Sequence, residues 1–238
     1  MEGIESVNVS FRNYVLPYPH PGGWALNQES CKFLGNLVSS LKVENILEFG
    51  SGYSSTIIAH ELTKAKTGFL YSIDNSTNWS MKAKHFAAQK HLSHKVDFHV
   101  FKLSLKFYPK IAYIFYDIDD RFYKVCSLYD LVVIDGPSHN IGRDGALYEI
   151  FSKVKVGGFF FVDDSRSDHM NSVIKKWSLS FPTSVSIRNF YEIGNGITII
   201  KKIRDVHDEP HIAFRQSLTS WIKALRNYMR LRTLKLND

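Results

Sequence analysis

The stretch that decides the fold is residues 45–65, which read NILEFGSGYSSTIIAHELTKA. Its first five residues form a short apolar run, and Gly50, Ser51 and Gly52 follow in a combination typical of a tight turn. From Ser54 onward, apolar residues recur at helical spacing. The stretch therefore predicts a strand, a glycine-rich turn and a helix in direct succession.

The same alternation of apolar runs and helical patterns continues along the chain. The next apolar runs are residues 68–73, 96–101, 131–134 and 158–162, and helical periodicity is found over 79–91 and 171–179. Runs this apolar are typical of parallel strands that are buried on both faces. Alternating β and α elements of this kind predict a doubly wound parallel sheet.

A tight hairpin follows the predicted parallel strands. Residues 184–190 and 196–200 have strand character and flank a short turn at Gly194 and Asn195. Strands that are joined so closely must run antiparallel. The sequence therefore predicts an α/β fold with a doubly wound, mostly parallel seven-stranded sheet that ends in an antiparallel hairpin.

The chain divides into a central domain and two flanks. The expected parts are residues 1–42, an irregular arm followed by a helix over 28–41 on the substrate side; 43–203, the sheet domain; and 204–238, a basic amphipathic helix. Asn27 is of the residue type that caps a helix at its N-terminus. Nothing in the sequence assigns the aromatic insertion over 105–128.

Composition favours one domain in a reducing compartment. The chain has 238 residues and a hydrophobic fraction of 44%, which is enough for a substantial core. Its two cysteines are too few for a disulfide framework or a thiolate zinc site. Because no apolar signal-like run follows the N-terminus, we expect a cytoplasmic protein.

The net charge of +7 is unevenly distributed. Residues 213–238 carry +5, which leaves +2 for everything before them. A body so nearly neutral argues against an extended nucleic-acid groove. The predicted helix over 213–236 places apolar side chains, Trp221 among them, on one stripe beside basic residues. Such a helix packs on its own domain, self-associates or lies peripherally at a membrane surface, and the sequence leaves these alternatives open.

Acidic residues lie at the ends of four predicted strands. They are Glu48, Asp74, Asp135, Asp163 and Asp164. Ligands of doubly wound sheets bind beyond the carboxyl ends of the strands, so these residues are candidates for a site, although each could also simply cap the helix that follows. A carboxylate at Glu48 would repel a pyrophosphate at the glycine turn, and the turn therefore favours a cationic ligand over a dinucleotide.

Three motifs resemble those of the class I S-adenosylmethionine-dependent methyltransferases. Residues 46–55 resemble the first motif of that family, and 130–136 and 156–164 resemble its fourth and fifth strand motifs. Together they cover roughly residues 43–202. The resemblance implies the Rossmann-like methyltransferase fold and S-adenosylmethionine as the cofactor.

The resemblance also implies roles for particular residues. Cofactor contacts are expected from Glu48, Gly50, Ser51, Gly52 and Tyr53, and Asp74 is expected to bind both ribose hydroxyls. The third-strand motif, which usually places an adenine contact, is recognisable only as Lys102-Leu103-Ser104, so Leu103 is the candidate there.

Methyl transfer to a hydroxyl needs a group that removes a proton. Asp135 and His139 are the candidate catalytic residues. The imidazole of His139 is a suitable base near neutral pH, because its ordinary pKa is ~6.5. Asp135, Asp163 and Asp164 also resemble the carboxylates with which O-methyltransferases of the catechol and macrolide-sugar types hold magnesium. The alternative is that Asp164 caps the next segment and that no metal binds.

The expected function is O-methylation of a small-molecule or a sugar or glycan hydroxyl. The aromatic arm over 18–24 is a candidate lid for such an acceptor. One alternative is an RNA or protein methyltransferase whose basic tail contacts phosphates, although nucleic acid is less favoured. Another is a non-catalytic scaffold with the methyltransferase fold.

Overall fold

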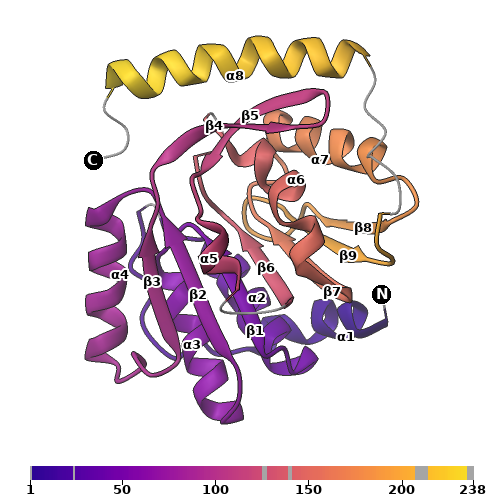
Figure 1. Ribbon diagram of the computed structural model, residues 1–238. Helices are drawn as coiled ribbons and strands as arrows, with labels where there is room; N and C mark the ends of the chain where they lie inside the picture. The colour runs from indigo at the N-terminus through magenta and orange to yellow at the C-terminus, as the bar shows by residue number, and fades with distance from the viewer. Residues whose placement is uncertain (1, 24, 125–127, 139–140, 207–213, 235–238) are drawn as a thin grey trace.

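A seven-stranded sheet forms the centre of the molecule (Figure 1). The computed structural model describes residues 2–23, 25–124, 128–138, 141–206 and 214–234. The strands of this sheet are β1 (Asn45–Phe49), β2 (Phe69–Asp74), β3 (Val96–Val100), β6 (Tyr129–Ile134), β7 (Val154–Val162), β8 (Val185–Phe190) and β9 (Ile197–Lys202). Their order across the sheet is β3-β2-β1-β6-β7-β9-β8.

The strand directions confirm the predicted fold class. Strands β3, β2, β1, β6 and β7 pair in parallel, and β9 is antiparallel to both β7 and β8. After β1 the chain builds outward through β2 and β3, then returns to place β6 on the other side of β1. The strand order therefore reverses between β1 and β6, which is where a doubly wound sheet binds its ligand.

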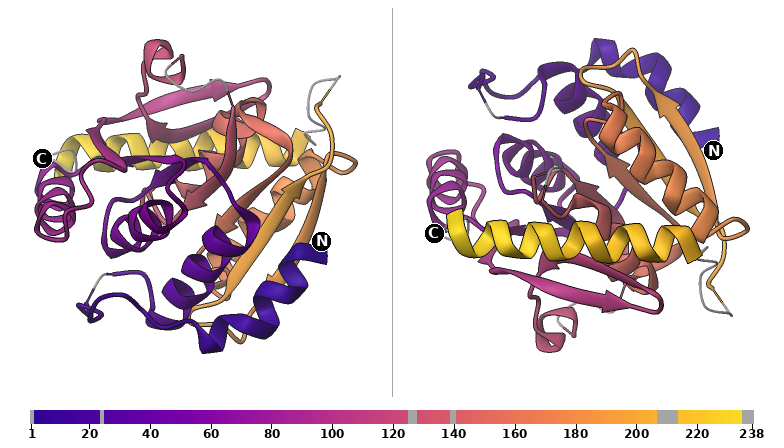
Figure 2. Two further views of the ribbon diagram at one scale, coloured as in Figure 1. Left: turned by 90° about the horizontal axis from the view of Figure 1, so that it is seen from below. Right: turned by 90° about the horizontal axis from the view of Figure 1, so that it is seen from above.

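Helices cover both faces of the sheet (Figure 2). One face is covered by α2 (Gln28–Leu41), α3 (Tyr53–Ala65) and α4 (Thr77–Gln89), and the other by α5 (Asp120–Tyr123), η2 (Arg143–Gly145), α6 (Ala146–Ile150), η3 (Phe151–Lys153) and α7 (Asp168–Ser180). Each face has its own hydrophobic core, and successive residues of β1 alternate between them: Ile46 belongs to one core and Leu47 to the other. Asn27 caps α2 as predicted, by accepting a hydrogen bond from the backbone N–H of Glu29.

The N-terminal arm is more ordered than the sequence predicts. Its first residues form α1 (Glu2–Ser10) and the short 3-10 helix η1 (Phe11–Asn13), so the expectation of an irregular arm is wrong for this part. Ile4, Val7 and Phe11 are buried. These three apolar residues form one narrow stripe along α1 and η1, which contact α2. A stripe of three residues is too short to be recognised as a helix from the sequence.

The insertion over 105–128 contains a separate hairpin. Strands β4 (Leu103–Tyr108) and β5 (Ile111–Tyr116) pair antiparallel outside the main sheet. All six residues of β5 are buried, because the strand packs on the core and the long helix α8 (Phe214–Leu234) lies along it (Figure 1). A strand buried on both faces lacks polar alternation, which is why the sequence does not reveal it.

No helix in the described ranges combines the length and apolarity that crossing a bilayer requires.

Lys202 of β9 offers a test of how the sheet is anchored. Its buried ammonium donates to the carbonyls of Phe151 and Val154, at 3.0 and 2.7 Å. We predict that Lys202→Met lowers the free energy of unfolding by about 1–3 kcal/mol, because two buried carbonyls lose their donor. Denaturant titration measures the effect, with Lys201→Met as the control on the same strand. Equal stabilities of the two variants would contradict the prediction.

Candidate active site

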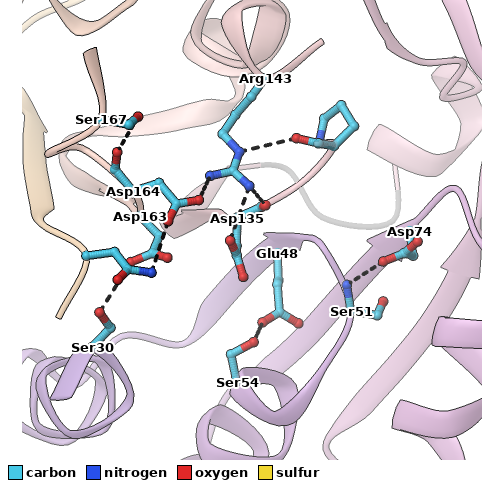
Figure 3. Close-up of polar contacts among 12 residues, drawn as sticks. Ser30, Glu48, Ser51, Ser54, Asp74, Asp135, Arg143, Asp163, Asp164 and Ser167 are labelled. Carbon is cyan, nitrogen blue, oxygen red and sulfur yellow. Dashed lines mark hydrogen bonds and ion pairs between the residues drawn. The ribbon is translucent and has the colours of Figure 1, made fainter. Parts of the chain in front are cut away.

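The structure brings the predicted acidic residues to one edge of the sheet (Figure 3). Glu48 lies in β1 and Asp74 closes β2. Asp135 directly follows β6, and Asp163 and Asp164 directly follow β7. Because β1, β2, β6 and β7 are parallel neighbours, their carboxyl ends meet at the point where the strand order reverses.

The glycine turn after β1 packs against the turn after β6. Gly50 has a φ of +99°, and a Cβ there would lie 2.8 Å from the backbone nitrogen of Gly136. The backbone N–H groups of Asp135 and Gly136 both donate to the carbonyl of Phe49, at 3.0 and 2.6 Å. Gly50 is therefore required both for its left-handed backbone and for this close approach. A Cβ at Gly52, by contrast, would meet open space.

Glu48 is fully buried beneath the glycine turn. Its carboxylate accepts hydrogen bonds from the hydroxyls of Ser54 at 2.6 Å, Ser72 at 2.7 Å and Ser55. Burial raises the pKa of Glu48 to about 7, and the three hydroxyls partly offset that rise. These contacts join β1 to α3 and β2, while direct contact between Glu48 and a cofactor stays a prediction.

Asp74 lies beside the glycine turn on the other side. One carboxylate oxygen accepts a hydrogen bond from the backbone N–H of Ser51 at 3.0 Å (Figure 3). The other accepts from the backbone N–H of Ser76 at 2.7 Å. Burial raises the pKa of Asp74. The backbone N–H of Asn75 is a third donor to this carboxylate. Because a carboxylate can accept about four hydrogen bonds, Asp74 keeps capacity for a bound ligand.

Asp135, Asp163 and Asp164 form a compact acidic cluster. One carboxylate oxygen from each lies within 4.8 Å of the others. Burial raises the pKa of both Asp135 and Asp163, and the neighbouring carboxylates raise the pKa of Asp163 further. The hydroxyl of Ser30 on α2 donates to Asp163 at 3.2 Å. The interpretation of Asp164 as a helix cap is wrong, because Ser167 caps α7.

Arg143 supplies a cation to this cluster, which the sequence analysis missed. Its buried guanidinium donates to the carboxylates of Asp164 at 2.9 Å and Asp135 at 3.3 Å (Figure 3). It also donates to the backbone carbonyls of Pro137, at 3.2 Å, and Asp135. One guanidinium thus holds the end of β6, the end of β7 and the loop that leaves β6.

Tyr116 is the second residue that the sequence analysis missed. Its hydroxyl is buried and has no hydrogen-bond partner among the described residues. A Cβ at Gly136 would lie 2.5 Å from this oxygen, so the hydroxyl is at the junction of the two turns. Burial raises the pKa of Tyr116 well above its ordinary value, and the charges of Asp74 and Asp135 act in the same direction.

The N-terminal arm lies against the start of α3. The hydroxyl of Tyr53 donates to the carbonyl of Tyr18 at 2.5 Å, and the hydroxyl of Tyr18 lies 3.2 Å from Nδ1 of His60. The ring centroids of His20 and Tyr53 are 5.2 Å apart. The aromatic arm therefore lies beside the glycine turn, because Tyr53 is the first residue of α3.

Leu103, the candidate adenine contact, is buried at the start of β4, where it pairs with Tyr116 of β5. Contact between Leu103 and a cofactor stays a prediction. His139, the candidate base, lies outside the described residues.

Comparisons with known proteins agree with the fold. The family described as "Methyltransferase domain" matches residues 47–165. Similar solved structures include an O-methyltransferase from Bacillus cereus in complex with SAH (17% identity, 85% of this chain and 91% of that chain, TM-score 0.55). They also include the O-methyltransferase TomG from Streptomyces achromogenes, which is involved in tomaymycin synthesis and is in complex with SAM (17% identity, 85% of this chain and 90% of that chain, TM-score 0.57). A third is an SAH-bound methyltransferase from Podospora anserina (12% identity, 86% of this chain and 89% of that chain, TM-score 0.58). No curated protein matches the chain.

The burial of Glu48 predicts a specific dependence of stability on pH. Its folded-state pKa of about 7 lies above the ordinary value of 4.5, so the folded state holds the proton more tightly. The resulting stabilisation is complete below pH 4.5 and is lost as the pH rises through 7.

We therefore expect the free energy of unfolding of the wild-type protein to fall by up to about 3 kcal/mol more than that of Glu48→Gln as the pH rises from 4.5 through 7. Urea titrations of ligand-free protein at several pH values measure the difference. Parallel pH profiles for the two proteins would refute the prediction.

Proposed function

The chain belongs to the methyltransferase domain family, and we propose that it transfers the methyl group of S-adenosylmethionine to a hydroxyl of a small molecule or sugar. The observation that carries this proposal is the glycine turn of β1, flanked by Asp74 and Asp135 where the strand order reverses. The structural neighbours in complex with SAM or SAH support the choice of cofactor.

The residues present fit such a cofactor. A Cβ at Gly52 would meet open space, so the turn is free to approach a ligand. Asp74 keeps capacity to accept a hydrogen bond from the ribose, and the buried hydroxyl of Tyr116 lacks a partner among the described residues. Gly50, Ser51, Gly52, Asp74 and Tyr116 would hold the cofactor.

When bound, S-adenosylmethionine would supply an electrophilic methyl group on a sulfonium, and transfer of that methyl group to an acceptor oxygen would release S-adenosylhomocysteine. The cationic groups of S-adenosylmethionine suit the carboxylate of Asp135. Asp135 would accept the proton of the acceptor hydroxyl on its second oxygen, because Arg143 binds the first. Burial raises the pKa of Asp135, which makes it a stronger base, and its side chain stays 21% exposed.

The same residues do not fit magnesium while Arg143 is in place. Magnesium requires near-octahedral oxygen ligands at about 2.0–2.1 Å. The guanidinium of Arg143 already pairs with Asp135 and Asp164, two of the three carboxylates predicted to bind the ion. We propose that Arg143 provides the positive charge at this position and positions Asp135.

The aromatic arm supports a polar acceptor. Residues 14–20 lie along α3, where Tyr18 contacts Tyr53 and His60, and Tyr14 contacts Glu61. We propose that the arm covers the acceptor, since aromatic rings suit the apolar face of a sugar.

The metal proposal has a direct test in calorimetric titration with magnesium and manganese. We expect no stoichiometric binding to the wild-type protein, and a gain of binding in Arg143→Met, because that variant frees Asp135 and Asp164. Arg121→Met, which removes an exposed arginine paired with Asp119, is the matched control. Stoichiometric binding to the wild-type protein that is lost in Asp163→Asn would show that the cluster is a metal site after all.

The cofactor proposal is tested by calorimetry with S-adenosylmethionine and S-adenosylhomocysteine, with NAD as the negative control. We expect both sulfur ligands to bind and Asp74→Asn to weaken them at least about tenfold, since hydrogen bonds to a charged group contribute about 1.5–3 kcal/mol. Asp97→Asn, an exposed carboxylate on β3, is the control. If neither sulfur ligand binds to the wild-type protein, the proposed methyltransferase activity is refuted and a non-catalytic scaffold is favoured.

A further inference from the structure

Helix α8 has an exposed apolar face. Its protein-facing side contains the buried residues Ala224, Asn227 and Leu231. Five large apolar side chains on another side are 48% to 63% exposed, namely Leu218, Trp221, Ile222, Leu225 and Met229. We call these five residues the α8 stripe. They recur every three or four residues, so they lie on one continuous side of the helix.

The β4–β5 hairpin extends the α8 stripe. Phe107 of β4 is 61% exposed, and its ring centroid lies 5.3 Å from that of Trp221. Helix α8 lies along the hairpin at the outer side of the molecule (Figures 1 and 2). Two elements far apart in sequence therefore contribute to one exposed apolar surface, which is a feature of interaction sites.

The charged residues of α8 and of the β4–β5 hairpin are all basic, although Lys106 of the hairpin is paired with Asp117. Helix α8 and the hairpin over 103–116 contain no acidic residue. Arg226 and Arg230 are exposed beside the α8 stripe, and Lys110 is exposed at the hairpin turn. Lys223 is instead paired with Asp144, at 2.8 Å. An apolar stripe with an adjoining cationic flank is typical of helices that lie in the interface of an anionic membrane.

We propose that the α8 stripe and Phe107 form a docking surface for an anionic lipid membrane. The apolar side chains enter the boundary between headgroups and acyl chains, and Arg226, Arg230 and Lys110 contact anionic headgroups. A second copy docked through the same stripe would bring like charges together. An RNA would neutralise the cations but would leave the α8 stripe in water. The proposal does not depend on methyl transfer.

Co-sedimentation of the full-length protein with lipid vesicles tests the apolar contribution. We expect binding to vesicles of phosphatidylcholine with phosphatidylserine, and not to phosphatidylcholine alone. Trp221→Ser/Ile222→Ser should weaken binding at least about tenfold, because two inserted side chains are lost. Val156→Ser/Leu179→Ser removes exposed apolar residues elsewhere and should bind as the wild-type protein does.

The variant Arg226→Glu/Arg230→Glu tests the charge contribution. Its binding should also fall at least about tenfold, and wild-type binding should weaken as salt rises. Because these arginines are exposed, this variant decides the question if the serine variant fails to fold. Thermal unfolding of each variant monitors folding.

Several outcomes would overturn the proposal. One is a wild-type protein that does not bind anionic vesicles, or that binds neutral vesicles equally well. Another is a dimer in analytical ultracentrifugation that Trp221→Ser/Ile222→Ser abolishes, which would assign the α8 stripe to a second copy. A third is salt-sensitive RNA binding with no vesicle binding, which would assign the cationic flank to nucleic acid.

Discussion

The arrangement of the site depends on hydrogen bonds and an opposite charge that compensate buried and half-buried carboxylates at one edge of the sheet. A buried carboxylate is costly unless hydrogen bonds or an opposite charge balance it. Hydroxyls from α3 and β2 surround Glu48, and the guanidinium of Arg143 joins Asp135 to Asp164. Each compensating group comes from a different element than the acid it binds. The contacts that stabilise the charges therefore also fix β1, α3, β2 and the loop after β6 relative to one another.

The sheet was predictable because its strands leave clear marks in the sequence. The parallel strands are mostly apolar and end at turns, and the final two strands are joined too closely to be parallel. The meeting of the acidic residues follows from that topology alone. Arg143 was not predictable, because it lies in a segment without clear periodicity and it binds Asp164 across 21 residues of sequence. Tyr116 was hidden for another reason, since β5 is buried on both faces and shows no alternation.

Tertiary packing buries one side of helix α8 and leaves its apolar stripe exposed, a distinction that the sequence alone does not show. Helical spacing places its apolar residues on one stripe, yet the side that packs on the protein includes Ala224 and Asn227. Asn227 donates to the carbonyl of Ile141 at 2.7 Å, and Lys223 pairs with Asp144. These two contacts flank Arg143 on its loop. Helix α8 thereby supports the segment that holds the acidic cluster, while the α8 stripe is exposed at the surface.

The contact between the turns at Gly50 and Gly136 limits how this sequence can change over evolutionary time. A Cβ at either position would lie 2.8 Å from backbone atoms of the other. A mutation that adds a side chain on one turn forces the strands apart unless the other turn moves as well. Both positions are therefore held to glycine together, because the obstacle at each is the backbone of the other and no substitution can remove it.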